Sequence, residues 1–251
     1  MRVAVAGGTG VAGTAVVGRL RSLGHIPVVL SRSSGVDLLT PSRELDESLD
    51  GVDAVIDAGN VQTLSRRASE KFFSTVTTTL MDAEERAGVT HHVALSIVGS
   101  DRVDTGYYAG KRLQESMVRT SSVPWTIVRA TQFHQFTEQA LATTRGPIAM
   151  VPVMTSAPIA VEEVAERLVE LALGHALSLV TQIAGPQQEH QPDLARRVLR
   201  ARGSRRIVVP LRVPGAGGRA MATGGLLPDG DCVRGVETFD QWLRRESVSG
   251  R

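Results

Sequence analysis

The stretch GGTGVAG at residues 7–13 constrains the fold more than any other part of this 251-residue chain. It follows the apolar run VAVA at residues 3–6 and leads directly into the helix-like sequence VAGTAVVGRL. Glycine permits a sharp turn between strand and helix and lets the backbone approach a phosphate, to which the helix N-terminus offers free N–H groups. The sequence predicts a dinucleotide cradle, with a purely structural turn as the alternative. The loop residues expected to contact the cofactor are Gly7, Thr9, Gly10, Val11, Ala12 and Gly13.

Short apolar runs alternate with longer amphipathic segments along the first half of the chain. These runs cover residues 3–6, 26–30, 54–57, 92–96 and 125–130. They are rich in Val and Ile and lack polar alternation, which is typical of parallel strands covered on both faces. Two of the intervening segments end at Gly24 and Gly88, where helices are expected to stop. The pattern predicts an α/β fold with a doubly wound parallel sheet, the Rossmann arrangement.

The pattern of apolar runs and amphipathic segments changes after about residue 130. Strands are expected in IAMVPV, LSLVTQIAG and RIVVPL, and helices in VEEVAERLVELAL, DLARRVLRA and TFDQWLRR. Residues 214–231, PGAGGRAMATGGLLPDGD, are expected to form a loop-rich stretch because glycine is so frequent there. We expect one NAD(P)-binding domain over residues 1–251, in which about 131–251 supply the remaining strands of the sheet and a small substrate-covering lobe.

The composition excludes several classes of function. A net charge of +2, with 42% hydrophobic and 22% charged residues, is ordinary for a globular protein. The basic run at residues 195–206 is interpreted as a solvated helix face rather than a nucleic-acid site. The single cysteine, Cys232, predicts neither a disulfide nor a metal site. From the sequence pattern we expect neither a membrane helix nor a signal peptide. We therefore expect a cytoplasmic protein without metal, nucleic-acid or membrane partners.

The end of the second strand predicts which dinucleotide is bound. Ser31, Arg32 and Ser33 follow the strand, and no carboxylate occurs before Asp37. An acidic residue here would bind the 2′-hydroxyl of NAD, whereas a guanidinium flanked by hydroxyls suits the 2′-phosphate of NADP. The sequence favours NADP(H) over NAD(H), with an exposed surface arginine as the alternative. Asp37, with Leu38 beside it, is placed to accept a hydrogen bond from the adenine amino group.

The third strand ends in AVIDAGN. Its small residues Ala58 and Gly59 would let the adenosine side of the cofactor lie against the backbone, and Asn60 follows them at the same edge of the sheet.

A Tyr-x-x-x-Lys pair, Tyr107 and Lys111, lies in GYYAGKRLQE. On a helix this spacing places both side chains on one face. Because the phenol has a pKa near 10, it exchanges protons poorly at neutral pH unless a nearby ammonium stabilises the phenolate. The pair predicts a catalytic tyrosine with a lysine that lowers its pKa and also holds the nicotinamide ribose.

These motifs together resemble the short-chain dehydrogenase/reductase superfamily in its atypical or extended form. The closer similarity is to the NmrA-like, NAD(P)H-binding branch, often described as nucleoside-diphosphate-sugar epimerase-like. The segments that carry it are GGTGVAG, SRSSGVDL, GVDAVIDAGN, HHVALSIVGSDRV, GYYAGKRLQE, VPWTIVRATQF and PIAVEEVAERLVELA. The resemblance covers nearly the whole chain and implies a Rossmann core with a small C-terminal substrate lobe. It leaves the reaction open, because the branch contains reductases, isomerases and proteins that only bind the dinucleotide.

The resemblance also implies a hydroxyl group after the fourth strand as a third catalytic group. Ser96 stands at the strand end and Ser100 four residues on, whereas the superfamily pattern would place the hydroxyl at Ile97 or Val98. Ser96 would either complete a triad or contact the cofactor ribose, and Ser100 would face the substrate.

The segment after the fifth strand is implied to lie against the nicotinamide. The cofactor and pocket residues expected there are Ala130, Thr131, Gln132, Phe133 and His134. His91 and His92, by contrast, are expected to be exposed loop residues.

The leading hypothesis is an NADPH-dependent reductase that transfers hydride to a carbonyl or quinone-like carbon of an apolar or aromatic small molecule. The alternatives are a non-enzymatic NADP(H)-binding redox sensor of the NmrA type and a sugar-nucleotide epimerase or dehydratase. The chain is expected to act as a monomer or a homodimer.

Overall fold

The computed structural model describes residues 1–249, without the side chains of the last two of these. The elements up to the fifth strand are β1 (Arg2–Ala6), α1 (Val11–Ser22), β2 (Ile26–Leu30), the 3-10 helix η1 (Arg32–Ser34), α2 (Arg43–Leu49), β3 (Ala54–Asp57), α3 (Arg66–Ala87), β4 (His91–Ile97), α4 (Gly106–Arg119) and β5 (Trp125–Ala130). The later elements are α5 (Phe136–Ala142), β6 (Ile148–Pro152), β7 (Thr155–Ser156), α6 (Val161–Ala172), β8 (Val180–Ala184), β9 (Glu189–His190), α7 (Gln191–Ala201), β10 (Ile207–Leu211), α8 (Gly215–Ala222), β11 (Val233–Arg234) and α9 (Phe239–Ser249).

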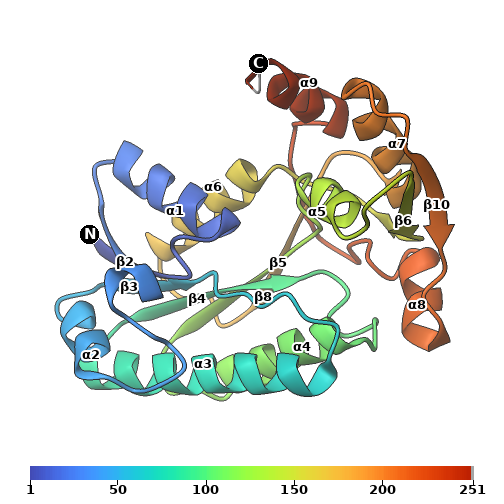
Figure 1. The fold of residues 1–251 in the computed structure, drawn as a ribbon. Coiled ribbons are helices and arrows are strands. Elements are labelled where there is room, and N and C mark those ends of the chain that lie inside the picture. The colour runs from blue at the N-terminus through green and yellow to red at the C-terminus, as the bar shows by residue number, and fades with distance from the viewer. Residues whose placement is uncertain (250–251) are drawn as a thin grey trace. The chain divides into compact units, whose positions relative to one another are not determined.

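The main sheet has seven strands in the order β11-β8-β5-β4-β3-β1-β2. The pairings of β1 with β2 and β3, of β3 with β4 and of β8 with β11 are parallel, with Val3 opposite both Pro27 and Ala54. Helices α1 and α6 lie on one face of the sheet, and α2, α3 and α4 lie on the other (Figure 1). The predicted α/β fold with a doubly wound parallel sheet is confirmed.

The chain divides into two compact units. Unit 1 comprises Met1–Ser100, Thr105–Arg129 and Val161–Thr181, and unit 2 comprises Asp101–Asp104, Ala130–Ala160 and the chain from Gln182 on. The prediction of a substrate-covering lobe at about residues 131–251 stays a prediction.

In unit 1 the helices α3 and α4 pack unusually closely because two glycines lie where they meet. A Cβ atom on Gly110 would stand 2.1 Å from Ser69 Oγ, and one on Gly106 would stand 2.2 Å from Leu64 O. Ser69 Oγ also donates a hydrogen bond to the Tyr107 carbonyl oxygen. These contacts fix the start of α4, and with it the position of the Tyr-x-x-x-Lys pair, against the face of α3.

The helix α2 was not anticipated from the sequence. Ser42 caps it by accepting a hydrogen bond from the Leu45 N–H at 3.2 Å, and Leu45 and Leu49 are fully buried. The cap serine and the acidic first turn with Glu44 and Asp46 are the signals that could have predicted it.

Two predictions for the later chain are wrong. Residues 148–153 and 206–211 were expected in the main sheet, but β6 and β10 form a separate parallel pair in unit 2, with Ile148 opposite Ile207. The stretch 214–231 was expected to be loop, but it contains α8. Gly218 of that helix is buried, and a Cβ there would stand 1.8 Å from Val213 O. Close packing therefore requires glycine here and overrides its low helix propensity.

His91 and His92 are also placed differently from the expectation of exposed loop residues. Both belong to β4 and are buried. His91 Nε2 lies 2.9 Å from Thr126 Oγ1, and His92 Nδ1 lies 2.9 Å from Glu84 Oε1. Each ring is accommodated in the interior because a polar partner is built next to it.

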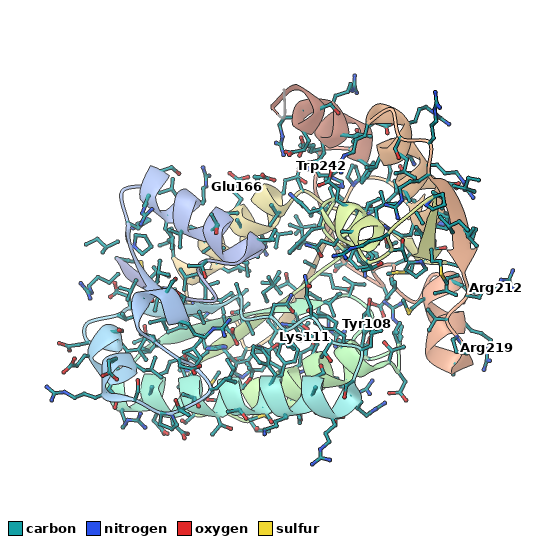
Figure 2. All side chains as sticks on the ribbon, viewed as in Figure 1. Tyr108, Lys111, Glu166, Arg212, Arg219 and Trp242 are labelled. Atoms are coloured by element: carbon teal, nitrogen blue, oxygen red, sulfur yellow. The ribbon has the colours of Figure 1, made fainter. Side chains whose placement is uncertain are left out.

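The core of unit 2 surrounds α7, which packs against α5, α9, β6 and β10. Trp242 of α9 is fully buried among the side chains of this core (Figure 2), which are Leu141, Ala149, Val151, Leu194, Ala195, Val198, Leu199, Phe239 and Leu243. Among the helices described within residues 1–249, none has the length and apolar character that crossing a bilayer requires.

Candidate dinucleotide-binding and catalytic site

The glycine loop between β1 and α1 is so closely packed that a side chain on Gly7 or Gly13 would not fit. Gly7 has φ = 69°, in the left-handed region that favours glycine. A Cβ atom on Gly7 would stand 2.9 Å from Ala58 O, and one on Gly13 would stand 2.1 Å from Gly7 O. Helix α1 begins at Val11, and its N-cap residue Gly10 provides no side-chain cap. The first N–H groups of α1 therefore face the loop without a side-chain acceptor, which fits a bound pyrophosphate.

The turn after β2 presents an arginine to solvent. Ser31 and Ser34 cap one another across η1, with the Ser31 N–H donating to Ser34 Oγ at 3.0 Å. Ser31 Oγ lies 3.0 Å from Ser33 Oγ. Arg32 is exposed, and its guanidinium makes no hydrogen bond or ion pair with the part of the chain that the structure describes. Asp37 is also exposed and accepts a hydrogen bond from the Leu39 N–H. The serine turn is thus held by its own hydrogen bonds, while the Arg32 side chain is available to an anion.

The loop after β3 contacts both the glycine cradle and α4. Its Ala58 and Gly59 backbone lies against Gly7, as the blocked Cβ position there indicates. Asp57 Oδ1 accepts a hydrogen bond from the Gly59 N–H at 2.8 Å. The next residue, Asn60, accepts a hydrogen bond from the Tyr107 hydroxyl at 2.9 Å. The predicted cofactor residues of β1 and β3 and the predicted catalytic tyrosine therefore meet at one end of the sheet.

The surroundings of Tyr107 are aromatic. Its ring packs edge-on against Phe73 and Tyr108, with centroids 5.9 Å and 5.8 Å away. Removal of the phenol from water, with Tyr108 beside it, raises the pKa of Tyr107 above its ordinary value of 10. The expectation that Lys111 lowers this pKa is wrong for the resting structure, and the phenol keeps its proton at neutral pH.

Lys111, on the same helix as Tyr107, contacts β4, α4 and α3 rather than the Tyr107 hydroxyl. Its Nζ donates to Leu95 O at 2.8 Å and to Gln114 Oε1 at 3.0 Å, and it lies 4.4 Å from the centre of the Phe73 ring. Figure 2 shows Lys111 and Tyr108, both of which belong to α4. Burial lowers the pKa of Lys111 to about 8, against the opposing effects of Asp57 and Glu115. The i, i+4 spacing does place Tyr107 and Lys111 on one face, but each has its own hydrogen-bond partner.

Both serine candidates donate to one buried carboxylate. Ser96 Oγ and Ser100 Oγ lie 2.5 Å and 2.9 Å from Glu115 Oε1. Arg129 binds the same carboxylate at 2.9 Å and 2.7 Å. Although burial opposes it, these partners hold the pKa of Glu115 below its usual range. Ser96 and Ser100 are therefore hydrogen-bond partners of Glu115 in this structure, and their assignment to a triad and to a substrate-facing position stays a prediction.

Glu115 is the residue that the sequence reading missed. The signal was an arginine inside the apolar run 125–130, because a cation within a buried strand requires an acidic partner.

The residues predicted to line a pocket after β5 lie in unit 2. Thr131 Oγ1 donates to Ala157 O at 2.5 Å, and Phe133 forms a β-bridge with Ile159. His134 is fully buried, with its ring centre 5.4 Å from that of Phe239 and 5.5 Å from that of Trp242. His134 is therefore a core residue of unit 2, since its ring is packed between aromatic neighbours, and its assignment to a pocket is wrong. The roles of Ala130, Thr131, Gln132 and Phe133 stay predictions.

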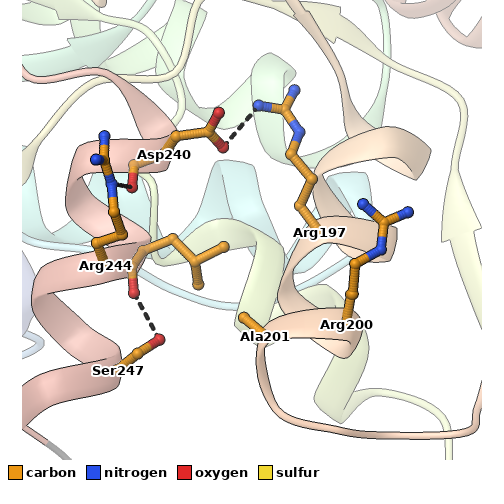
Figure 3. Close-up of a pocket in the computed structure, with 7 residues that line it drawn as sticks. Arg197, Arg200, Ala201, Asp240, Arg244 and Ser247 are labelled. Carbon is orange, nitrogen blue, oxygen red and sulfur yellow. Dashed lines mark hydrogen bonds and ion pairs between the residues drawn. The ribbon is translucent and has the colours of Figure 1, made fainter.

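A groove between α7 and α9 of unit 2 contains none of the predicted site residues. Its lining residues are Arg197, Arg200, Ala201, Asp240, Leu243, Arg244 and Ser247 (Figure 3). Two of its arginines are held by Asp240, whose carboxylate accepts from Arg197 at 3.0 Å and whose carbonyl accepts from Arg244 at 3.1 Å. Within residues 1–249, no three or more His, Cys, Asp or Glu side chains come together as metal ligands.

A parallel sheet with a glycine cradle after its first strand defines a Rossmann-type dinucleotide-binding protein. Residues 7–173 match the model of a family described as NAD(P)H-binding, and the chain belongs to that family.

Similar proteins include both reductases and other dinucleotide-binding enzymes. A (4-alkanoyl-5-oxo-2,5-dihydrofuran-3-yl)methyl phosphate reductase from Streptomyces griseus is 31% identical over 144 residues, which are 52% of this chain and 48% of that protein. The chain therefore spans about half the length of this curated relative.

Two solved structures share the fold over nearly all of both chains. An NADPH-dependent quinone oxidoreductase from Escherichia coli in complex with NADPH has a TM-score of 0.72 and 16% identity, over 97% of this chain and 99% of that one. A short-chain dehydrogenase/reductase superfamily protein from Agrobacterium tumefaciens with bound NAD has a TM-score of 0.71 and 17% identity, over 100% and 97%.

Proposed function

We propose that this protein is an NADPH-dependent reductase of a small molecule with a carbonyl or quinone-like carbon. One observation carries the proposal: the loop after β3 contacts the glycine cradle at Gly7 and the Tyr107 hydroxyl through Asn60. A phenolic proton donor and a dinucleotide cradle thus share one loop. Reductases among the similar proteins, the Streptomyces griseus enzyme and the Escherichia coli quinone oxidoreductase, support the same reaction class.

The cradle and the turn after β2 would hold the cofactor. The N–H groups at the start of α1 would bind its pyrophosphate, and Arg32 would bind the 2′-phosphate that distinguishes NADPH from NADH. Lys111 would hold the nicotinamide ribose. When bound, the cofactor would supply a hydride. The protein's part is to hold and orient it and to provide the proton.

Tyr107 would donate that proton to the substrate oxygen as negative charge develops there. Its raised pKa keeps the phenol protonated at neutral pH, so Tyr107 carries the proton that reduction of the substrate oxygen consumes. The hydroxyl would exchange its hydrogen bond from Asn60 to the substrate oxygen. A small apolar or aromatic substrate suits the ring cluster of Phe73 and Tyr108 around it.

Replacement of Tyr107 by phenylalanine tests the proposal. Since general acid catalysis contributes about 10²–10⁴-fold, we expect Tyr107→Phe to lower turnover by about that factor while NADPH binding stays near normal. NADPH oxidation with a panel of quinones and ketones, together with calorimetric titration of NADPH, measures both quantities.

Tyr108→Phe is the matched control, because it removes a hydroxyl from the adjacent, buried ring and leaves the Tyr107 hydroxyl in place. We expect it to keep turnover within about threefold of wild type. Equal turnover in Tyr107→Phe and wild type would exclude Tyr107 as the acid.

A second candidate is a redox sensor that binds NADP(H) without using it. It is favoured by one observation: the Tyr107, Ser96 and Ser100 hydroxyls all have protein partners in the resting structure. Tight NADPH binding without oxidation on any substrate of the panel would favour the sensor.

A further inference from the structure

Lysine is rare in this chain, and one of its two lysines is buried. Of 28 basic residues, only Lys71 and Lys111 are lysines and the others are arginines. Arginine stays charged under all ordinary conditions, whereas lysine can lose its proton when it is buried. Lys71 is exposed on α3, but Lys111 is only 3% exposed. Among the lysines and arginines of the described residues, Lys111 is therefore the buried one that can change its charge near neutral pH.

A chain of hydrogen bonds connects Lys111 to the loop after β3. Lys111 Nζ donates to Gln114 Oε1 at 3.0 Å, and Gln114 Nε2 donates to Asp57 Oδ2 at 2.7 Å. The other oxygen of Asp57 accepts from the Gly59 N–H at 2.8 Å. Asp57 is fully inaccessible to solvent and Gln114 is 1% exposed. Gln114 thus presents its oxygen to the lysine because its amide nitrogen is committed to Asp57.

The charges around Lys111 come from four elements. Asp57 on β3 and Glu115 on α4 both favour the ammonium. Glu84 on α3 and His92 on β4 form a buried pair that interacts with Asp57. Glu115 is already held by Arg129, Ser96 and Ser100. Asp57 is therefore the carboxylate whose charge is directed to Lys111, through Gln114.

We propose that Asp57 and Gln114 are positioning residues for Lys111, which hold its ammonium in place and keep it charged for the ribose of the bound cofactor. The use of Lys111 by a cofactor rests on the proposed function, whereas the hydrogen-bonded set itself does not. The same carboxylate orients Gly59, so one buried aspartate arranges both the cofactor loop and the lysine. This role explains why a helix position facing the core carries a glutamine instead of an apolar residue.

The titration of Lys111 in the resting protein tests this proposal without substrate. Lysine labelled with ¹³C at the ε-carbon gives two NMR signals, and exposed Lys71 serves as the internal reference. For the wild type we expect a midpoint of about 8 for Lys111. Asp57→Asn and Gln114→Met each remove a group that stabilises the ammonium. In each variant we therefore expect the titration midpoint of Lys111 to fall by about one pH unit. The surface variant Asp82→Asn makes the same chemical change as Asp57→Asn on the exposed face of α3 and should leave the midpoint unchanged.

The sign of the shift separates positioning from simple structural support. If the two side chains only filled space, their loss would admit water, and the Lys111 midpoint would rise towards its ordinary value of 10.5. A rise, or no change, in both variants would overturn the proposal. Circular dichroism establishes that each variant is folded, and Gln114→Asn, which keeps an amide, is the second variant should Gln114→Met not fold.

Binding of NADP⁺ across the same pH range tests the connection to the cofactor. The pH at which NADP⁺ affinity falls is expected to follow the Lys111 midpoint in wild type, Asp57→Asn and Gln114→Met. If the midpoints move and the affinity does not follow, the positioning role stands and the proposed contact of Lys111 with the cofactor fails.

Discussion

At the scale of single residues, the site depends on which hydrogen-bond partner each polar side chain has. Tyr107 and Lys111 lie one helical turn apart, but they have different hydrogen-bond acceptors. Asn60 accepts from the Tyr107 hydroxyl, and Gln114 accepts from the Lys111 ammonium. Arg32 differs from both, because its guanidinium faces solvent without a partner among the described residues. A side chain in that state loses no existing interaction when it binds a phosphate, so its full charge is available to discriminate between cofactors.

Arg32→Ala should reverse the proposed preference for NADP⁺. A hydrogen bond to a charged group contributes about 1.5–3 kcal/mol, so we expect NADP⁺ affinity to fall by about 10–100-fold. NAD⁺ lacks the 2′-phosphate, and its affinity should stay within about twofold of wild type, because no contact to it is removed. Calorimetric titration with both dinucleotides measures the difference. Arg21→Ala on the exposed side of α1 is the matched control, and equal losses for NADP⁺ and NAD⁺ in Arg32→Ala would contradict the assignment.

At the scale of elements, α1 contains two glycines with opposite structural roles. A Cβ on Gly13 would overlap the Gly7 carbonyl oxygen at 2.1 Å, whereas a Cβ on Gly18 would have nothing within 4 Å. Gly13 is buried at the cradle, and Gly18 is exposed on the helix surface. The first is required by the close approach of helix and loop, and the second only weakens the helix.

Alanine at each position should therefore act in opposite directions. Gly13→Ala forces the helix and the loop apart, and we expect it to lower the free energy of unfolding by about 1–3 kcal/mol and to weaken dinucleotide binding. Gly18→Ala should raise the free energy of unfolding by about 0.5–1 kcal/mol and leave binding unchanged. Urea unfolding and NADPH titration of the two variants measure these effects. A Gly13→Ala protein as stable and as tightly binding as wild type would show that the cradle can open.

At the scale of the whole molecule, the chain crosses between the two units several times. Strands β5 and β8 each have residues assigned to both units, and α6 of unit 1 follows a long segment of unit 2. Neither unit is a continuous stretch of chain, so neither can be separated by one cut. Cooperative unfolding of both units is the consequence that we expect from this chain path.

The two tryptophans report this cooperativity, because Trp125 belongs to unit 1 and Trp242 to unit 2. In Trp125→Phe and Trp242→Phe, each with one remaining tryptophan, we expect the fluorescence midpoint in urea to coincide with that of far-ultraviolet circular dichroism of the same variant. Separate midpoints in either variant would mean that the units unfold independently.

The sequence by itself determined the fold class, the first five strands and the glycine cradle. These follow from local rules: apolar runs predict buried strands, and glycine at Gly7 and Gly13 is needed wherever backbones nearly touch. The tertiary structure alone decided the partners of the polar side chains. In the folded chain, buried His92 pairs with Glu84, and Ser96 and Ser100 both donate to Glu115. Lys111 is connected to Asp57 by hydrogen bonds through Gln114.

The physical reason is that a hydrogen bond depends on distances between segments far apart in the chain, whereas a strand or a turn depends on its own neighbours. Lys111 and Asp57 are separated by more than fifty positions in the sequence, and the residues next to each of them do not predict that the two are connected. A motif can therefore predict which residues carry a charge, but only the folded chain determines where that charge is held and how strongly.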